Sequence, residues 1–512
     1  MLLRVRKQAD GADCMTPLDV LRSSTFGKRT AEEEREQLHA YFVETKQWSR
    51  VFSGEIDVVY GPKGSGKSAI YSLISQNQEA LFDRNVIVVP GENPQGTPAF
   101  KDLGDNPPES EFEFVNLWKL YILTLCAQSM KDYGVTGEKC KLVIKTLEDA
   151  ELIPSIFTLS KALKYVFDYV RSLSRAESIQ AGVAIDPVTG MPIGLTGKIV
   201  LREPGLSQAK HGIVSIDDLF RLANDALIEA GLVIWVVLDR LDVAFADKQD
   251  LENQALRALF KAYLDTKACK AISTKIFLRT DIWANILHEG FREASHIERS
   301  LDIKWKSEDL INLVVRRALS NSHICEYYNV KKEEILADYN SQERFIYRMF
   351  PDQVETGSNK PKTFGWILGR TRDSMQPTTP RELIHFLNEL RDQQINRLQR
   401  GEKSLPEGKL FEQIAFKDAL PAVSKVRLEQ TLFAEFPKLK MAIEALKEQK
   451  ATQNLHNLGL LWGVDAVTAL DTAYKLEDIG FFERLGVHPD VAWRVPFLYR
   501  PSLNLIQGSA DS

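Results

Sequence analysis

The chain has 512 residues, 44% of them hydrophobic and 26% charged, with a formal net charge of -5 at neutral pH. This length predicts roughly two to four domains with sizeable cores, and the acidic balance argues against a strongly basic nucleic-acid-binding protein, although a local basic patch is compatible with it. The five cysteines are scattered without metal-ligand spacing, and no apolar stretch reaches the length of about 18 residues that suggests a membrane span. We therefore expect a cytoplasmic protein with no signal peptide and no membrane partner.

The first 29 residues are polar and mixed in character, and they predict a loosely ordered leader. Acids at positions 32–34, after Thr30, predict the first turn of a helix. Its apolar face is expected to consist of Leu38, Tyr41, Phe42 and Trp48 and to pack beside the domain that follows.

The stretch after the apolar run 56–60 carries the pattern G-x-x-x-x-G-K-S, which is typical of a phosphate-binding loop. Its residues are Gly61, Pro62, Lys63, Gly64, Ser65, Gly66, Lys67 and Ser68. Glycines let successive backbone N–H groups turn inward around an anion, and the predicted following helix adds its positive N-terminal end. We expect Lys67 to reach the β- and γ-phosphates of ATP and the Ser68 hydroxyl to coordinate Mg²⁺.

Strand and helix patterns alternate after this loop. Residues 85–89 predict a short buried strand that completes a right-handed β-α-β unit, and 112–130 predict a helix buried on most sides. A further helical pattern covers 139–174. The region of about 176–212 contains several glycines and prolines, which predict an inserted loop or hairpin with no assigned chemical role.

A second motif begins with the continuous apolar run 232–238, as expected of a central parallel strand that is covered on both faces. Asp239 follows at the carboxyl end, where open α/β sheets bind ligands, and is predicted to be the Walker B carboxylate near the Mg²⁺ on Ser68. Asp242 is interpreted either as the residue that orients or deprotonates the attacking water or as a helix-capping or turn aspartate.

A third strand pattern, 274–278, ends in Arg279-Thr280-Asp281. Arg279 is our candidate for stabilising charge on the γ-phosphate, the alternative being a surface arginine. Arg292 and Arg299 are weaker candidates for reaching the nucleotide of a neighbouring subunit.

Residues 306–400 contain helical patterns, and Thr379-Pro380-Arg381-Glu382 marks a helix start by a capping-box pattern with Pro at the first helical position. Arg381 would lie in the first turn, an unfavourable place for a cation in the helix dipole. An anion should therefore compensate it, either a bound phosphate or a Glu on a nearby helix.

A polar linker, 401–409, precedes the C-terminal part. Helical segments followed by two short strands, at 480–482 and 493–498, predict a winged-helix-like domain over 410–512. Its basic residues could meet DNA phosphate, but interleaved acids favour a mixed solvated face. They are Lys425, Arg427, Lys438 and Lys440.

Four motifs together, at 60–68, 238–242, 277–281 and 379–382, resemble a bacterial DRLD-type P-loop ATPase family. That family is similar to STAND, KAP and origin-recognition-like AAA+ ATPases. The resemblance implies an α/β P-loop NTPase core of three layers with a parallel sheet over 30–305, a helical lid over 306–400 and a C-terminal winged helix. It also implies that Arg381 matches the sensor-2 arginine, and that the chain is a homo-oligomer serving as a regulator in bacterial antiviral defence beside a separate effector protein.

The chain departs from AAA+ ATPases at one position, because Arg240 stands where their Walker B strands have a Glu that activates water. Hydrolysis is therefore expected to be slow, with Asp242 in the place of that Glu. Our first hypothesis is an ATP-binding, Mg²⁺-dependent ATPase that acts as a nucleotide-dependent switch or assembly subunit. The alternatives are a DNA-binding initiator or loader that uses its winged helix on duplex DNA, and a scaffold that does not use nucleotide.

Overall fold

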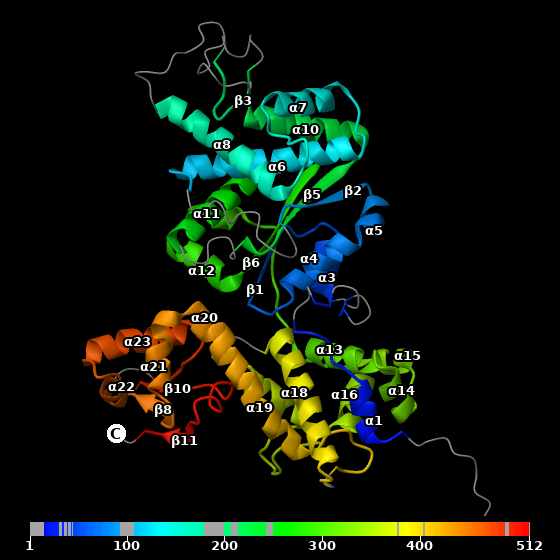
Figure 1. The fold of residues 1–512 in the computed structure, drawn as a ribbon, viewed down its shortest axis with the longest axis vertical. Helices are drawn as coiled ribbons and strands as arrows, with labels where there is room; N and C mark the ends of the chain where they lie inside the picture. The colour runs from blue at the N-terminus through cyan, green and yellow to red at the C-terminus, as the bar shows by residue number, and fades with distance from the viewer. Residues whose placement is uncertain are drawn as a thin grey trace, which may run out of the picture. The chain divides into compact units, whose positions relative to one another are not determined.

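The computed structural model describes residues 15–29, 33–34, 38, 42–43, 45–92, 107–178, 199–205, 213–241, 249–375, 378–402, 405–486 and 491–510. The chain divides into two units, which are drawn in Figure 1. Unit 1 comprises Met1–Val43 and Trp305–Ser512, and unit 2 comprises Glu44–Lys304.

Unit 2 is built on a five-stranded sheet with the strand order β2-β5-β6-β1-β7. Every neighbouring pair in this sheet is parallel, as the apolar runs predicted. The strands are β1 (Val58–Gly61), β2 (Val86–Pro90), β5 (Val233–Leu238), β6 (Ile272–Arg279) and β7 (Ser300–Asp302). Because all strands run the same way, the residues that follow β1, β2, β5 and β6 lie at one edge of the sheet.

One face of this sheet belongs to a large hydrophobic core. Val58, Val236 and Ile276 point into it, together with most of the buried side chains of the surrounding helices. Those helices are α6 (Glu111–Asp132), α7 (Glu138–Asp149), α8 (Leu159–Ser178), α10 (Ile216–Ala230) and α11 (Gln249–Thr266). Helix α6 is apolar on nearly every side, as predicted, and the Trp118 indole N–H donates to the Ala255 carbonyl of α11 at 2.8 Å.

The opposite face carries the alternate residues of the same strands, among them Val59, Val237 and Phe277, which are also buried. Helix α4 (Lys67–Gln76) covers this face, and the Tyr71 ring lies edge-on to Phe277 with centroids 6.2 Å apart. The short helices of unit 2 are α3 (Lys46–Phe52), α5 (Gln78–Phe82), α12 (Thr280–His288) and η3 (Arg292–His296). A separate two-stranded sheet pairs β3 (Ile199–Val200) in parallel with β4 (Val214–Ser215). Residues 179–198 and 206–212 of the predicted insertion lie outside the described residues.

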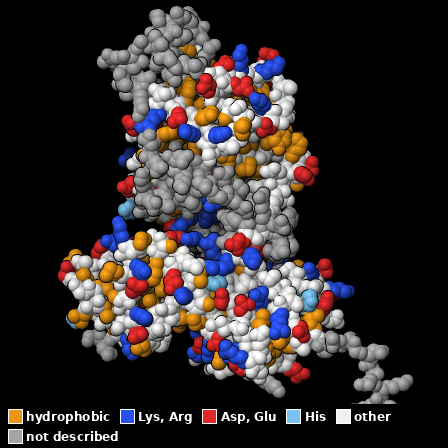
Figure 2. Space-filling model, in the orientation of Figure 1, with side chains coloured by type: hydrophobic (Ala, Val, Ile, Leu, Met, Phe, Trp, Pro, Cys, Tyr) orange, Lys and Arg blue, Asp and Glu red, His pale blue; other side chains and the backbone are white. Residues whose placement is uncertain are grey.

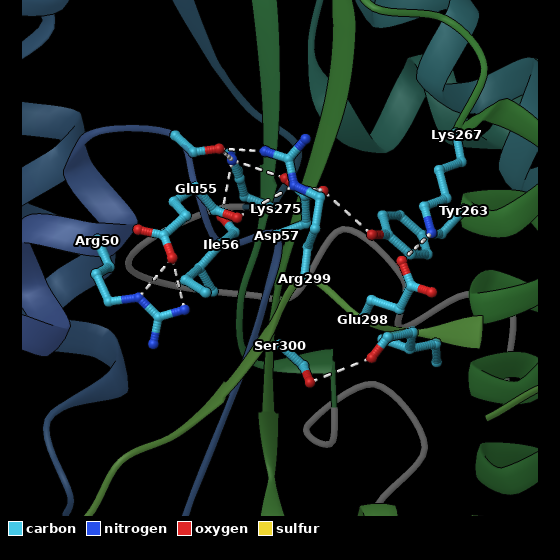
Figure 3. Close-up of polar contacts among 12 residues, drawn as sticks. Arg50, Glu55, Ile56, Asp57, Tyr263, Lys267, Lys275, Glu298, Arg299 and Ser300 are labelled. Carbon is cyan, nitrogen blue, oxygen red and sulfur yellow. Dashed lines mark hydrogen bonds and ion pairs between the residues drawn. The ribbon is translucent and has the colours of Figure 1, made fainter. Parts of the chain in front are cut away.

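The amino-terminal edge of the sheet is joined by a polar network around Asp57, shown in Figure 3. Lys275 Nζ lies 2.7 Å from Asp57 Oδ1, with the two side chains 1% and 6% exposed. Arg299 Nε lies 3.0 Å from Asp57 Oδ2, and the Tyr263 hydroxyl donates to that oxygen at 3.1 Å. Arg299, a candidate for a neighbouring nucleotide, is therefore engaged in tying β7 to β1 and β6.

Two predictions at the N-terminal side are corrected by the structure. The predicted leader contains a helix, α1 (Pro17–Ser23), with a capping box between Thr16 and Asp19. The helix expected from Thr30 to Trp48 is not continuous, because residues 42, 43 and 45 are not helical and the Thr45 hydroxyl caps a new helix, α3. Most of its expected first turns lie outside the described residues.

Unit 1 combines the N-terminal segment with the helices predicted as a lid. They are α13 (Ser307–Leu319), α14 (Ser322–Tyr328), α15 (Lys332–Leu336), α16 (Tyr339–Met349), α17 (Thr363–Thr371), α18 (Pro380–Gln399) and α19 (Gln413–Arg427). Phe26 is buried in their core beside Phe411. A buried ion pair of 2.8 Å between Arg317 and Glu34 holds the same segment, which explains why it groups with unit 1.

The C-terminal part of unit 1 follows α19 with four short helical segments and a small sheet. The helical segments are η4 (Leu428–Leu432), α20 (Phe433–Glu435), η5 (Pro437–Leu439) and α21 (Lys440–Glu444). Then come β8 (Lys450–Asn454), α22 (Leu455–Trp462), α23 (Ala466–Asp478), β9 (Glu483–Leu485), β10 (Ala492–Arg494) and β11 (Ile506–Ser509). The sheet order is β11-β8-β10-β9, with β10 antiparallel to both β8 and β9.

The strands expected in this part are only partly confirmed. Trp493 and Arg494 lie in β10, but residues 480–482 are not in a strand, and β9 begins at Glu483. Strands β8 and β11 were not predicted, because β8 is polar and lacks a strong alternation.

Within the described ranges, no helix has both the length and the apolar character that a membrane crossing requires.

Candidate nucleotide-binding site

The predicted phosphate-binding loop connects β1 to α4, as expected from its sequence. Gly64 and Gly66 have φ angles of +83° and +99°, in the left-handed region that glycine adopts without a Cβ clash. A Cβ at Gly61 would lie 2.4 Å from Ser65 Oγ, so the Ser65 side chain packs directly against this glycine. The sequence GPKGSGKS therefore adopts a tight turn that presents backbone groups at the start of a helix.

The first turn of α4 carries the two side chains predicted to meet the nucleotide. Lys67 Nζ donates to the carbonyl oxygens of Gly61 at 2.7 Å and Pro62 at 3.0 Å, so the ammonium group lies over the loop. Ser68 is the next residue of the helix. Because the first N–H groups of a helix have no intrahelical acceptor, this end of α4 favours a negative charge.

Asp239 follows β5 directly and is 5% exposed. The β5–β6 register pairs Leu238 with Ile276, so Asp239 is level with Phe277 and shares its face of the sheet. Helix α4 covers that face, because its Tyr71 packs on Phe277. Ser68 lies three residues before Tyr71 and is therefore on the same side of the helix. Asp239 is thus on the side of the sheet that α4 covers.

The chain turns sharply after Asp239. Arg240 has a φ of +57°, an uncommon left-handed conformation for a residue with a long side chain. Residues held in such conformations often lie at functional sites, because the surrounding structure must enforce them. Asp242, the sequence-based candidate for activating water, lies outside the described residues.

Arg279 ends β6 and is level with Gly61 in the β1–β6 register. Its guanidinium forms two hydrogen bonds to Asp281, with Nε–Oδ1 at 3.0 Å and Nη2–Oδ2 at 2.6 Å. Burial raises the pKa of Asp281, but the hydrogen bonds and charge of Arg279, and the nearby charge of Lys67, outweigh it and hold that pKa below its usual value. Sequence reasoning chose Arg279 and missed the carboxylate that links it electrostatically to Lys67.

Arg381 belongs to unit 1, in the first turn of α18, whose N-cap is Thr379 and whose first residue is Pro380. Neighbouring Glu382 bonds to Arg427 at 3.1 Å and accepts from the Thr379 hydroxyl. No hydrogen bond or ion pair to Arg381 is found among the residues that the structure describes. Of the two compensating anions considered above, a Glu on a nearby helix is therefore absent from the described part of the chain.

Sequence reasoning also missed Glu92, which is 1% exposed and follows the end of β2. Its carbonyl oxygen accepts from the Tyr71 hydroxyl of α4 at 3.0 Å, and the Gly91 carbonyl accepts from Tyr121 of α6 at 2.8 Å. An acid three residues after the predicted strand 85–89, at the edge where parallel sheets bind ligands, was the available signal.

The fold and the site define an α/β protein with a parallel central sheet and a glycine-rich loop between its first strand and the following helix. No family model and no curated protein matches the chain. A comparison with solved structures found the Aeropyrum pernix ORC2 protein, whose structure contains ADPNP–ADP complexes. The two chains are 11% identical over 95% of this chain and 98% of that one, with a TM-score of 0.27, too low to infer a shared fold.

Proposed function

We propose that unit 2 binds ATP with Mg²⁺ at the Gly61–Gly66 loop and hydrolyses it slowly. The observation that carries this proposal is the loop itself, with left-handed Gly64 and Gly66 turning the chain into the N-terminus of α4 beneath the Lys67 ammonium. Backbone N–H groups in this arrangement suit the oxygens of a triphosphate, and the Lys67 charge would move from carbonyl oxygens to phosphate.

The residues present also fit a magnesium ion. The Ser68 hydroxyl and the Asp239 carboxylate are oxygen donors, the ligand type that Mg²⁺ prefers, and they lie on the same face of the sheet. When bound there, Mg²⁺ would neutralise charge on the phosphate oxygens. Asp239 is buried before any ligand is added, so its carboxylate is held in place by the fold.

Calorimetry with ATP and Mg²⁺ tests the proposal. We expect Lys67→Ala to abolish measurable binding, because the loop then loses the cation that meets the phosphates. The matched control is Lys145→Ala, which changes an exposed lysine on α7 and should bind as the wild type does. A wild-type protein that gives no heat with ATP and Mg²⁺, or a Lys67→Ala variant that binds normally, would contradict a nucleotide site in this loop.

We further propose that ATP acts as a switch or assembly signal. Arg240 in the place of the usual Glu supports slow turnover, so that a bound state would persist. Light scattering with and without ATP should show a change in oligomeric state, and the same oligomer in both samples argues against the switch. A role beside a separate effector in antiviral defence comes from the family resemblance, and a pull-down from the native cell tests it.

The second candidate, a DNA-binding ATPase, is favoured by one feature of the C-terminal part. The order β8, α22, α23, β9, β10, with β10 between β8 and β9, is the arrangement expected of a winged helix. However, the exposed side of α23 carries Asp471 paired with Lys475 at 2.6 Å, besides exposed Val467. On the face that Figure 2 shows, hydrophobic side chains lie among charges of both signs in this part.

Fluorescence anisotropy with labelled duplex DNA at two salt concentrations separates the two candidates. Binding through phosphate contacts must weaken steeply as salt rises. We expect no salt-dependent DNA binding at moderate ionic strength, because the face of α23 is not basic. Tight, strongly salt-dependent binding would instead favour the initiator or loader.

A further inference from the structure

Because the chain lacks the Walker B glutamate, another carboxylate must orient the attacking water and accept its proton. The position after Asp239 is occupied by Arg240, which has no acceptor to offer a water proton. A replacement must lie at the same edge of the sheet, near Asp239, and on the face that α4 covers.

Glu92 satisfies these conditions through strand register. The β2–β5 ladder pairs Val86 with Val233 and Pro90 with Val237, so two residues further on Glu92 is level with Asp239. The pairing continues beyond Pro90, because the Gly91 N–H donates to the Val237 carbonyl at 2.8 Å. Level residues on neighbouring strands are about 4.8 Å apart.

The contacts of Gly91 and Glu92 place Glu92 at the end of β2, beside α4. A Cβ placed on Gly91 would lie 2.6 Å from Leu238 Cδ2, so Gly91 faces the core side of the sheet, which Leu238 shares. Gly91 and Glu92 then form a bend, so the chain leaves the direction of β2 at this point. The hydrogen bond from the Tyr71 hydroxyl of α4 to the Glu92 carbonyl places it beside that helix.

Glu92 is also held firmly. Tyrosines from helices on opposite faces of the sheet, Tyr71 and Tyr121, donate to consecutive carbonyl oxygens at the end of β2. The negative charge of Glu92 contributes to a raised pKa of the Tyr121 hydroxyl, after the larger effect of burial. A buried acid in such a fixed position matches the requirement for general base catalysis, in which geometry must be established before the reaction.

Building on the proposed ATPase function, we propose that Glu92 is the carboxylate that orients the attacking water and accepts its proton. In this step the water oxygen forms a bond to the γ-phosphorus while the bond from that phosphorus to the β–γ bridging oxygen breaks. The water proton passes to Glu92 and is then released to solvent, leaving ADP and inorganic phosphate. Asp239 remains the magnesium ligand, so the two level carboxylates have different tasks.

The test combines ATP turnover with nucleotide binding in the full-length protein. We expect Glu92→Gln to lower kcat by about 100-fold or more, as loss of a general base does, while the Kd for ATP stays near the wild-type value. The variant should retain labelled ATP rather than ADP after incubation, which a purely structural role would not produce. The matched control is Glu79→Gln, an exposed acid on α5 that should hydrolyse ATP at the wild-type rate.

A second variant shows whether lost turnover is due to the missing carboxylate or to misfolding. Glu92→Asp keeps a carboxylate, and we expect it to restore part of the turnover lost in Glu92→Gln. Near-wild-type kcat in both Glu92 variants would overturn the inference, as would Asp242→Asn abolishing turnover while Glu92→Gln does not. If the wild type binds no ATP, the proposed function itself fails. If the wild type hydrolyses ATP and Glu92→Gln does so equally fast, only the role of Glu92 fails.

Discussion

Arg240 is the single residue at which the backbone departs most from ordinary geometry near the site. Its left-handed φ of +57° follows the buried Asp239, so the chain leaves β5 by a sharp turn. A positive φ raises the conformational free energy of a residue with a Cβ, and it does so most for a β-branched residue.

The strain at this turn gives a comparison of two variants. We expect Arg240→Val to be about 1–2 kcal/mol less stable than Arg240→Gly, because valine tolerates positive φ poorly and glycine adopts it freely. Denaturant unfolding of both variants measures this difference. Since both remove the arginine side chain, its lost interactions cancel in the comparison, and equal unfolding midpoints would contradict the argument.

At the scale of the strands, the Asp57 network determines how β1, β6 and β7 are aligned. Burial lowers the pKa of Lys275, and the charge and hydrogen bond of Asp57 act against that effect. Both Lys275 and Asp57 are buried, and further groups form hydrogen bonds with them. One of these is the Ile56 carbonyl, which accepts from Lys275 Nζ at 2.8 Å. Register matters to the site, because it brings Arg279 level with Gly61 at the other edge.

Removing one partner of this pair should be costly. We expect Lys275→Met to lower the free energy of unfolding by about 3–5 kcal/mol, because Asp57 is then left buried beside fewer compensating charges. Chemical denaturation followed by tryptophan fluorescence measures it. The control is Lys304→Met, at an exposed lysine of the same unit, which should change stability by less than about 0.5 kcal/mol. Similar effects of the two substitutions would show that the network contributes little.

Helix α17 offers a pH-dependent test at the same scale. The Trp366 indole N–H, Lys360 and Arg370 all act on Glu355, and together they lower its pKa to about 2. Because the folded pKa is below that of the unfolded chain, the stabilisation is fully present above about pH 4.5 and is lost as the pH falls towards about 2.

Glu355→Gln should therefore destabilise the protein at neutral pH and matter little in acid. We expect a loss of about 1 kcal/mol at pH 7, since the carboxylate is partly exposed, and a smaller difference from the wild type at pH 3. Unfolding curves of both proteins at the two pH values measure this. A difference that stays constant or grows on acidification would contradict the assignment.

At the scale of the whole molecule, two arginines in unit 1 contrast sharply. Arg427 is bound by Asp373 at 3.0 Å and Glu382 at 3.1 Å, so it is an internal structural cation and not the DNA-facing residue considered from the sequence. Arg381 has no hydrogen-bond or ion-pair partner among the described residues. Arg381 therefore stays our sequence-based candidate for a residue that meets phosphate.

Substitution of the two arginines should therefore affect different properties, ATP affinity for Arg381 and thermal stability for Arg427. We expect Arg381→Ala to weaken ATP binding by about 10-fold, through loss of one charge-assisted hydrogen bond, and to leave the melting temperature unchanged. Arg427→Ala should lower the melting temperature clearly, because two carboxylates lose their partner. Calorimetry and thermal denaturation of both variants check this, and normal ATP affinity in Arg381→Ala would remove it from the site.

The phosphate-binding loop, the Asp239 strand and the start of α18 could all be found in the sequence, because each depends on residues adjacent in the chain. Glycine at a left-handed position, a run of β-branched residues and Thr-Pro at a helix start are local signals. The division of the chain could not be found in this way, since residues 15–43 join unit 1 through contacts with residues more than 280 positions away, such as Arg317 with Glu34.

Only the tertiary structure decided which side chains share the site. Glu92 and Asp239 are separated by about 150 residues of chain, and their positions at neighbouring strand ends depend on hydrogen bonds between β2 and β5 that no local pattern encodes. The same holds for the link between Lys67 and Asp281, which follows from the pairing of β1 with β6. Sequence patterns are sufficient where a few neighbouring dihedral angles determine the geometry, whereas register and burial arise from the packing of distant segments.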